Sequence, residues 1–317
     1  MRNETVYNYE LLDWIDERNL KQPYLCCNPN AIQLLQKHPE EINWYELSKN
    51  SNAICILEKN LEKVNWRRLS ENENAIELLV KNREKIVWSC LCYNKNALFL
   101  LEKNPEIIDW IELSGNPNAI HLLERNIEKI DWIELSGNPN AIHLLEKNQE
   151  KIDWIELSGN PNAIHLLEKN QEKIDWYELS GNPNAIHLLE KNIENIDFES
   201  LSQNPSAVCI LDKNIEKIYW CRLSMNPSAI SILEKHMDKI EWCLLSMNPC
   251  AMHLLKKNIE KINWSVLSIN PSIFNKKMNY KCLYQKMNVI REELMMKCMH
   301  PSRLERFLEM GGDIDDF

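Results

Sequence analysis

The chain lacks any apolar run near the roughly 20 residues that a membrane-spanning helix needs, and it begins with no recognisable secretory leader. Neither end carries a lipidation signal. Glycine is scarce, with 6 in 317 residues, and there is no Gly-rich phosphate loop, HExxH pair or nucleophile elbow. We therefore expect a protein that is not secreted and not in a membrane, with no catalytic residues, no cofactor and no metal site.

The cysteines and charges limit the partners. There are 11 cysteines, an odd number scattered along the chain, and without a leader they indicate reduced thiols in a cytosol-like compartment. The net charge is −10, but eight Lys or Arg face only three acids between Ile273 and Arg306. The acidic repeats should repel phosphate backbones, so we expect no nucleic acid to bind along them. Binding of nucleic acid stays possible only at residues 276–306.

A phrase of 22 residues recurs without a gap from Asn28 to Ile269, giving eleven copies. The copies that begin at Asn138 and Asn160 differ only in having Ile155 and Tyr177, respectively, in one slot. Such repeats form stacked arrays in which each unit contacts its neighbours. We predict an all-α fold, an α-solenoid of eleven two-helix repeats over 28–269, with an N-terminal cap at 1–27 and a helical C-terminal cap with an acidic tail at 270–317.

Each copy predicts two short helices. Asn138 followed by Pro is typical of a helix start, and Asn148, which tolerates the left-handed conformation, is a natural end. Asp153 with Glu156 three residues later resembles a capping box for the second helix, and Gly159 is expected to adopt a positive φ. At helix spacings of about 8 to 10 Å, the copies should stack into a rod or arc on the order of 100 Å long.

One slot is aromatic in every copy, and we predict that it forms a buried structural seam. Replacing one such side chain by Ala should lower the unfolding free energy by roughly 3 to 5 kcal/mol. The residues are Trp44, Trp66, Trp88, Trp110, Trp132, Trp154, Trp176, Phe198, Trp220, Trp242 and Trp264.

Two further columns are candidate partner-binding surfaces. The slot after Trp holds Ile111, Ile133, Ile155 and Tyr177 in the middle copies but accepts charge at Arg67 and Glu199, which argues against a deep core position. Two interpretations stay open, an exposed apolar strip for a partner and packing against the next copy. His121, His143, His165 and His187 form a second column. Successive members should lie one helix spacing apart, which is too far for all of them to bind one zinc ion. Three interpretations stay open: a metal site between two neighbours, a contact surface for a partner, and a solvated helix face.

The phrases NPNAIHLLEKN and IDWIELS resemble the short Asn-Pro repeats of proteins encoded in many copies by giant, amoeba-infecting, mimivirus-like DNA viruses. The ending HPSRLERFLEMGGDIDDF is similar to a C-terminal segment common in those genomes. The resemblance implies a viral protein of the host cytoplasm, the virus factory or the virion, and brings no catalytic residues with it. Some copies depart from the pattern, since Ser51, Glu73 and Lys95 replace the Pro.

Three functions remain open from the sequence. The first is a non-enzymatic scaffold that binds host or viral proteins along the solenoid face. The second is a structural component of the virion or virus factory. The third is an RNA-associated adaptor that works through Lys276, Lys277, Lys281, Lys286 and Arg291.

Overall fold

The computed structural model describes residues 7–298, 300, 303, 305–306 and 309–310. The chain is an all-α solenoid, as predicted, with one small two-stranded sheet besides its helices. It divides into two compact units, a repeat unit from Leu11 to Phe274 and a second unit that combines Met1–Glu10 with Asn275–Phe317.

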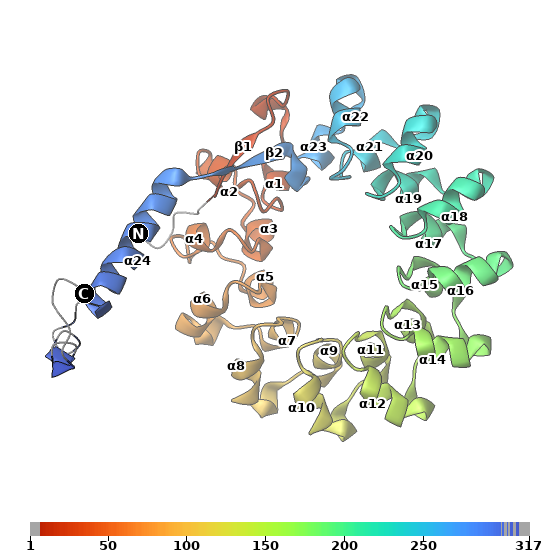
Figure 1. The fold of residues 1–317 in the computed structure, drawn as a ribbon, viewed down its shortest axis with the longest axis horizontal. Helices are drawn as coiled ribbons and strands as arrows, with labels where there is room; N and C mark the ends of the chain where they lie inside the picture. Colours follow the sequence, from red (N-terminus) through yellow and green to blue (C-terminus); the bar gives the residue numbers. More distant parts are fainter. Residues whose placement is uncertain (1–6, 299, 301–302, 304, 307–308, 311–317) are drawn as a thin grey trace. The chain divides into compact units, whose positions relative to one another are not determined.

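Residues 11–274, all of them described, place their helices in two layers (Figure 1). The inner layer holds α1 (Gln22–Leu25), α3 (Trp44–Lys49), α5 (Trp66–Glu71), α7 (Trp88–Leu91), α9 (Trp110–Ser114), α11 (Trp132–Gly137), α13 (Trp154–Gly159), α15 (Trp176–Gly181), α17 (Phe198–Gln203), α19 (Trp220–Met225), α21 (Trp242–Leu245) and α23 (Trp264–Leu267). The outer layer holds α2 (Ile32–Leu35), α4 (Ile54–Leu57), α6 (Ile76–Lys81), α8 (Leu98–Glu102), α10 (Ile120–Glu124), α12 (Ile142–Lys147), α14 (Ile164–Lys169), α16 (Ile186–Lys191), α18 (Val208–Lys213), α20 (Ile230–Lys235) and α22 (Met252–Lys257).

Short 3-10 helices connect most outer helices to the following inner helix. These are η2 (Pro39–Glu41), η3 (Arg83–Lys85), η4 (Pro105–Ile107), η5 (Ile127–Lys129), η6 (Gln149–Lys151), η7 (Gln171–Lys173), η8 (Ile193–Asn195), η9 (Ile215–Lys217), η10 (Met237–Lys239) and η11 (Ile259–Lys261). Two more, η1 (Glu17–Asn19) and η12 (Pro271–Ile273), lie near the ends of the repeat unit.

The core lies between the two layers and repeats in every copy. In the copy from Asn138, Ala141 just before the outer helix and Leu145 within it are fully buried, as is Leu157 of the inner helix. Ile152, just before the inner helix, is also buried. No α-helix of the repeat unit exceeds six residues, so burial of these side chains between layers must supply most of the stability.

The outer helices begin later than predicted. Ala141, not Asn138, is the residue before α12, and Asn138 instead ends α11 and heads a turn in which its Oδ1 accepts the Asn140 N–H at 3.0 Å. The predicted end at Asn148 is confirmed, but its φ of −132° is not left-handed. The sequence signal was read wrongly because an Asn side chain that forms a turn and one that caps a helix both accept a nearby backbone N–H.

The predicted start of the inner helices is confirmed. Asp153 Oδ1 accepts the N–H groups of Ile155 and Glu156, each at 3.0 Å, as an N-cap does. Gly159, however, lies inside α13 and has no positive φ. A Cβ at that position would lie 3.3 Å from Glu178 Oε2 of the next copy, so the glycine provides space and not an unusual backbone conformation.

The repeat unit closes into a ring (Figure 1). Asn28 Nδ2 donates to the carbonyls of Ser268 at 3.0 Å and Asn270 at 2.9 Å, so the first copy bonds to the last. The Lys21 N–H also donates to Ser268 Oγ at 2.9 Å, and the Leu12 N–H donates to the Ile273 carbonyl at 2.9 Å. We call this junction between α23 and α1 the seam.

Closure corrects two expectations. The copies do not form an open rod or arc, and residues 21–28 do not cover a free end, because they bond to residues 268–270 instead. The copy that starts at Asn270 is completed by the N-terminal segment. Ile273 is fully buried in its first half. Leu20 and Leu25 are also buried, and they stand 22 residues before Ile42 and Leu47 of the next copy, which are the equivalent core positions. One repeat is therefore assembled from both ends of the chain.

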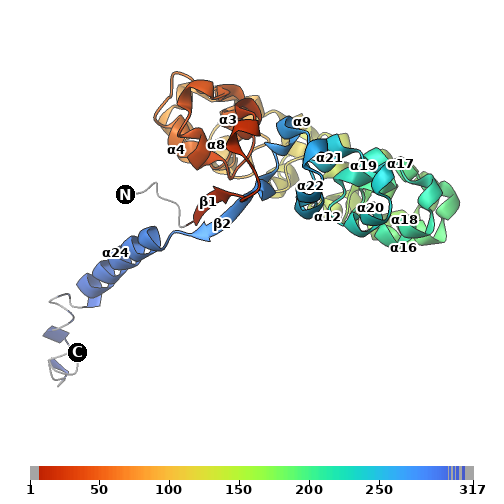
Figure 2. The same ribbon diagram turned by 90° about the horizontal axis from the view of Figure 1, so that it is seen from above.

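The second unit contains a sheet that the sequence analysis did not predict. β1 (Tyr7–Leu11) and β2 (Phe274–Met278) lie side by side (Figure 1, Figure 2). Lys277 pairs with Glu10, and Lys276 Nζ lies 3.7 Å from the centroid of the Tyr7 ring. The predicted C-terminal helix is present as α24 (Tyr280–Cys298), whereas the acidic tail from Asp313 to Asp316 lies outside the described residues.

Candidate interaction surface

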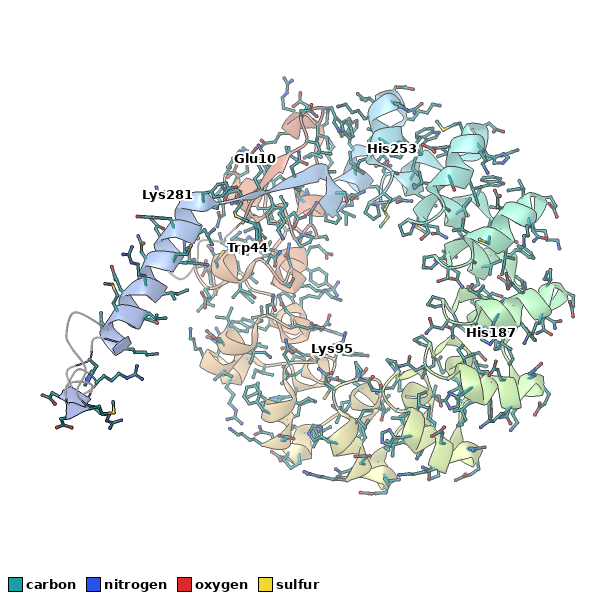
Figure 3. The ribbon with its side chains drawn as sticks, viewed as in Figure 1. Glu10, Trp44, Lys95, His187, His253 and Lys281 are labelled. Atoms are coloured by element: carbon teal, nitrogen blue, oxygen red, sulfur yellow. The ribbon has the colours of Figure 1, made fainter. Side chains whose placement is uncertain are left out.

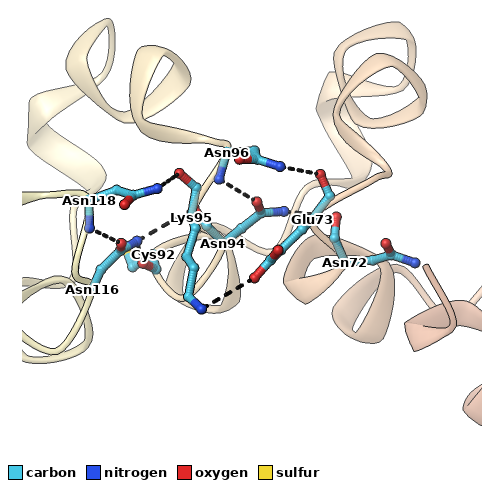
Figure 4. Close-up of polar contacts among 8 residues, drawn as sticks. All are labelled: Asn72, Glu73, Cys92, Asn94, Lys95, Asn96, Asn116 and Asn118. Atoms are coloured by element: carbon cyan, nitrogen blue, oxygen red, sulfur yellow. Dashed lines mark hydrogen bonds and ion pairs between the residues drawn. The ribbon is translucent and has the colours of Figure 1, made fainter. Parts of the chain in front are cut away.

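A buried asparagine ladder joins every copy to the one before it. Asn116 Nδ2 donates to the carbonyls of Cys92 at 2.8 Å and Asn94 at 3.5 Å, and Asn94 Nδ2 donates to the Asn72 carbonyl at 2.9 Å (Figure 4). With Asn28 bonded to Asn270, the ladder is continuous around the ring. Its members are Asn28, Asn50, Asn72, Asn94, Asn116, Asn138, Asn160, Asn182, Asn204, Asn226, Asn248 and Asn270, all buried.

The ladder uses the whole amide of each side chain. Asn160 Nδ2 donates to Ser136 and Asn138 carbonyls at 2.9 and 3.1 Å, and its Oδ1 accepts the Asn162 N–H at 3.0 Å. Asp could not make the two donor contacts, which explains why every copy has Asn here. Because these polar atoms are already bonded within the protein, the ladder holds the ring together and is no site for a ligand.

A serine at the end of almost every inner helix is a second link that the sequence analysis missed. Ser136 Oγ donates to the Trp132 carbonyl at 2.6 Å and accepts the Asp153 N–H of the following copy at 3.0 Å. Its recurrence after the buried Leu of almost every copy was the available signal. Two copies have Cys26 or Cys92 in this slot, and both thiols are fully buried.

The aromatic column is half-buried and not fully buried. In seven copies a lysine of the next copy lies over the aromatic ring: Lys151 Nζ lies 4.6 Å from the centroid of Trp132, a cation–π distance. The same contact, at 4.4 to 5.0 Å, joins Lys63 to Trp44, Lys85 to Trp66, Lys129 to Trp110, Lys173 to Trp154, Lys217 to Phe198 and Lys261 to Trp242. The aromatic column thus links neighbouring copies while its rings stay partly exposed to solvent.

The histidine column lies on the outer helices, as His187 and His253 show in Figure 3. Each of these side chains pairs with a glutamate of the preceding copy: His143 Nε2 lies 2.7 Å from Glu124 Oε1, and His165 Nε2 lies 2.9 Å from Glu146 Oε1. His121 and His187 make the same pair with Glu102 and Glu168 at 2.7 Å. Among the described residues, no three His, Cys, Asp or Glu side chains are grouped as metal ligands would be.

The apolar slot on the inner helices is exposed over four consecutive copies. Ile111, Ile133, Ile155 and Tyr177 are 57%, 55%, 55% and 49% exposed, respectively, and we call them the inner stripe. Their helices α9, α11, α13 and α15 pack against each other in sequence order. Because Leu113 and its equivalents bury the opposite side of these helices against the outer layer, the stripe faces away from the core.

A row of carboxylates runs beside the inner stripe. Glu112, Glu134, Glu156 and Glu178, which we call the glutamate row, follow the stripe residues directly in sequence. Burial raises the pKa of Glu112 above its usual range, and the neighbouring Glu134 raises it further. Burial likewise raises the pKa of Glu178, with added repulsion from Glu156 and Asp175. None of the ion pairs among the described residues includes a member of the glutamate row, which makes the row complementary to a basic partner.

Two further features are the buried thiol of Cys92 and the basic segment at residues 276–306. Burial raises the pKa of Cys92 to about 11, so this thiol stays protonated near neutral pH and is a poor nucleophile. In the basic segment, Lys276 and Lys277 already contact Tyr7 and Glu10. Lys281, Lys286 and Arg291 are exposed on α24.

Comparison of the chain with protein-family profiles, with curated proteins and with solved structures gave no match. None of the described helices combines the length and apolar character needed to cross a bilayer. The inner stripe with its glutamate row is thus the best-defined candidate surface, and its assignment depends on its own geometry.

Proposed function

We propose that this protein is a non-enzymatic ring scaffold that binds a basic, amphipathic protein segment along its inner stripe. The observation that carries the proposal is the run of four exposed apolar side chains on adjacent inner helices, bounded by Ser89 and Glu199 in the same slot of the copies on either side. Contiguous exposed apolar surface flanked by charge is typical of protein-binding sites.

The size of the stripe indicates what it accommodates. Neighbouring helices pack about 8 to 10 Å apart, so its four side chains span roughly 24 to 30 Å. An α-helix of about 16 to 20 residues covers that length. The partner segment should carry apolar side chains on one face, for the inner stripe, and Lys or Arg beside them, for the glutamate row.

The placement of the stripe on the inner layer favours this use. The side chains drawn in Figure 3 leave the middle of the ring open. A closed ladder of buried hydrogen bonds also holds the inner helices in fixed order, so a bound segment meets a pre-organised surface and little ordering entropy is lost on binding.

The test measures binding of two synthetic amphipathic helices by fluorescence anisotropy, one of Leu and Lys and the other of Leu and Glu. We expect the Lys peptide to bind and the Glu peptide to bind at least tenfold more weakly. Replacing Ile133 and Ile155 by Ser, which the slot accepts at Ser89 and Ser265, should weaken binding of the Lys peptide by about tenfold without adding charge.

The matched control replaces Cys221 and Cys243 by Ser, since both occupy the same slot outside the stripe. This control should bind like the wild type. Equal affinity of the Ile133→Ser, Ile155→Ser variant and the control would reject the inner stripe as the binding surface.

The resemblance to giant-virus repeats gives the setting of the proposal, an infected cell in which the ring acts in the host cytoplasm or virus factory. The competing role is that of a structural virion component. Quantitative proteomics of purified particles and infected cytoplasm separates the two, because enrichment in particles would favour the structural role.

A further inference from the structure

Helix α24 carries an exposed apolar face. Tyr280, Met287, Ile290 and Leu294 are 74%, 59%, 58% and 59% exposed, respectively, and Leu283 lies on the same face. With 19 residues, α24 is more than three times as long as any helix of the repeat unit. We call these five residues the α24 stripe.

The spacing of the α24 stripe fits a helical partner. Its members follow one another at intervals of 3, 4, 3 and 4 residues, which is the a and d pattern of a coiled coil. The outward f positions of this pattern hold the polar residues Gln285 and Glu292. A helix with this pattern packs its stripe side chain by side chain into that of another helix.

The charges that flank the stripe match a second copy of the same helix in antiparallel orientation. That orientation sets Met287 against Ile290 of the second copy, and Leu283 against Leu294. It brings Lys286 beside Glu293 of the second copy, and the twofold symmetry repeats this ion pair. A parallel pair would instead bring Lys286 beside Arg291 twice, which is repulsive.

The other flank agrees with the same orientation. Tyr284 meets Arg291 of the second copy, a pair suited to a cation–π contact. At the ends, Lys297 lies opposite Tyr280 of the second copy, so a charged residue in a d position also meets an aromatic ring. Each residue of the stripe or its flanks thus finds a complementary residue in its own sequence.

We propose that α24 is a self-association helix through which two copies of this protein pair in antiparallel orientation. The contact is a single pair of helices about 28 Å long, which places it at the lower end of specific interfaces, below about 1,200 Å² in total. We therefore expect a reversible dimer with a Kd in the micromolar range. A dimer would present two rings to one partner and raise avidity.

The experiment is sedimentation velocity of the full chain over a concentration range from about 1 to 300 μM, which brackets a micromolar Kd. We expect the wild type to shift from monomer to dimer, and Ile290→Glu to stay monomeric because it buries a charge in the contact. Lys286→Glu should weaken the dimer by about tenfold, since each attractive pair becomes a Glu–Glu pair. The double variant Lys286→Glu, Glu293→Lys restores both pairs and should recover the wild-type Kd.

Lys281→Glu is the matched control, because it makes the same change of charge at an outward position and should leave the Kd unchanged. Far-UV circular dichroism confirms that each variant keeps its helices. A wild type that is monomeric throughout overturns the proposal. A dimer that Lys286→Glu strengthens overturns the antiparallel orientation, since only a parallel pair would gain from that change.

Discussion

The seam and the interior junctions of the ring make the same hydrogen bonds from different chain connections. Between interior copies, Asn50 Nδ2 donates to Cys26 and Asn28 carbonyls at 2.9 and 3.1 Å, and at the seam Asn28 Nδ2 donates to Ser268 and Asn270 carbonyls at 3.0 and 2.9 Å. The interior partners are 22 to 24 residues apart, whereas the seam partners are 240 to 242 apart. The ladder therefore sets the geometry of a junction whether or not the chain connects its two sides.

The junction between α1 and the copy that starts at Asn28 differs from the others in its aromatic slot. Gln22 occupies this slot in α1, and its Oε1 is buried without a hydrogen-bond partner. A cavity of about 490 Å³ lies at this junction, lined by Gln22, Leu25, Leu34, His38 and other residues. At the seam itself the slot holds Trp264, so the seam differs from the interior because no continuous chain links its two sides. We expect the ring to open first at the seam.

The largest effect should come from breaking the ladder. Asn160→Asp removes two donors and leaves a buried carboxylate facing two carbonyls, so we expect a loss of about 3 to 5 kcal/mol in the free energy of unfolding. Asn28→Asp should open the seam while most helices persist. Circular dichroism in urea measures the free energy of unfolding of Asn160→Asp. For Asn28→Asp, small-angle scattering should show a larger radius of gyration while circular dichroism shows native helix content. Loss of all helicity on Asn28→Asp would contradict independent opening of the seam.

The aromatic contribution should be smaller because the column is half-buried. We expect Trp132→Ala to destabilise the ring by about 2 to 4 kcal/mol, less than a fully buried Trp would. The control Lys151→Met removes only the cation over the ring and should lose less than about 1 kcal/mol. Hydrogen exchange should show opening confined to α11 and its neighbours, and uniform loss of protection around the ring would argue against nearest-neighbour coupling.

Filling the aromatic slot of α1 should make its junction with the copy that starts at Asn28 resemble the other junctions. Gln22→Trp replaces an amide with a buried, unpartnered oxygen by an indole beside the cavity, and we expect a gain of about 0.5 to 2 kcal/mol in the free energy of unfolding. Hydrogen exchange of α1 and α3 should slow to the rate of the other inner helices. Faster exchange there would mean that Gln22 and the cavity do not weaken this junction.

The smallest effect concerns the glutamate row of the interior copies. Glu178 has a raised pKa in the folded ring, so its ionised form destabilises the fold, and this penalty appears as pH rises through the folded pKa. Glu178→Gln should therefore have a higher Tm than the wild type at neutral pH. The difference should vanish as the pH falls below the ordinary value of 4.5, because both side chains are then neutral. A constant difference across pH would contradict this cause.

Patterns within one copy were predicted most reliably. The inner helix after Asp153 and the end of the outer helix at Asn148 followed from local propensities. The role of Asn138 was missed, because its Nδ2 donates to Ser114 and Asn116, partners that belong to the preceding copies. The exposed slot of Ile133 was recognised as a candidate surface because Arg and Glu occupy it elsewhere.

The sequence by itself determined that every junction between copies is nearly the same, since near-identical copies must pack in near-identical ways. A constant turn at each junction means constant curvature, but its size depends on small tilts between packed helices that no single copy encodes. Only the tertiary structure decided that the curvature returns Asn270 to Asn28 and joins the two halves of one repeat into a closed ring. The physical reason for closure is that an open array would leave the Asn28 amide at one end and the Ser268 and Asn270 carbonyls at the other end without partners, and closure pairs them with each other.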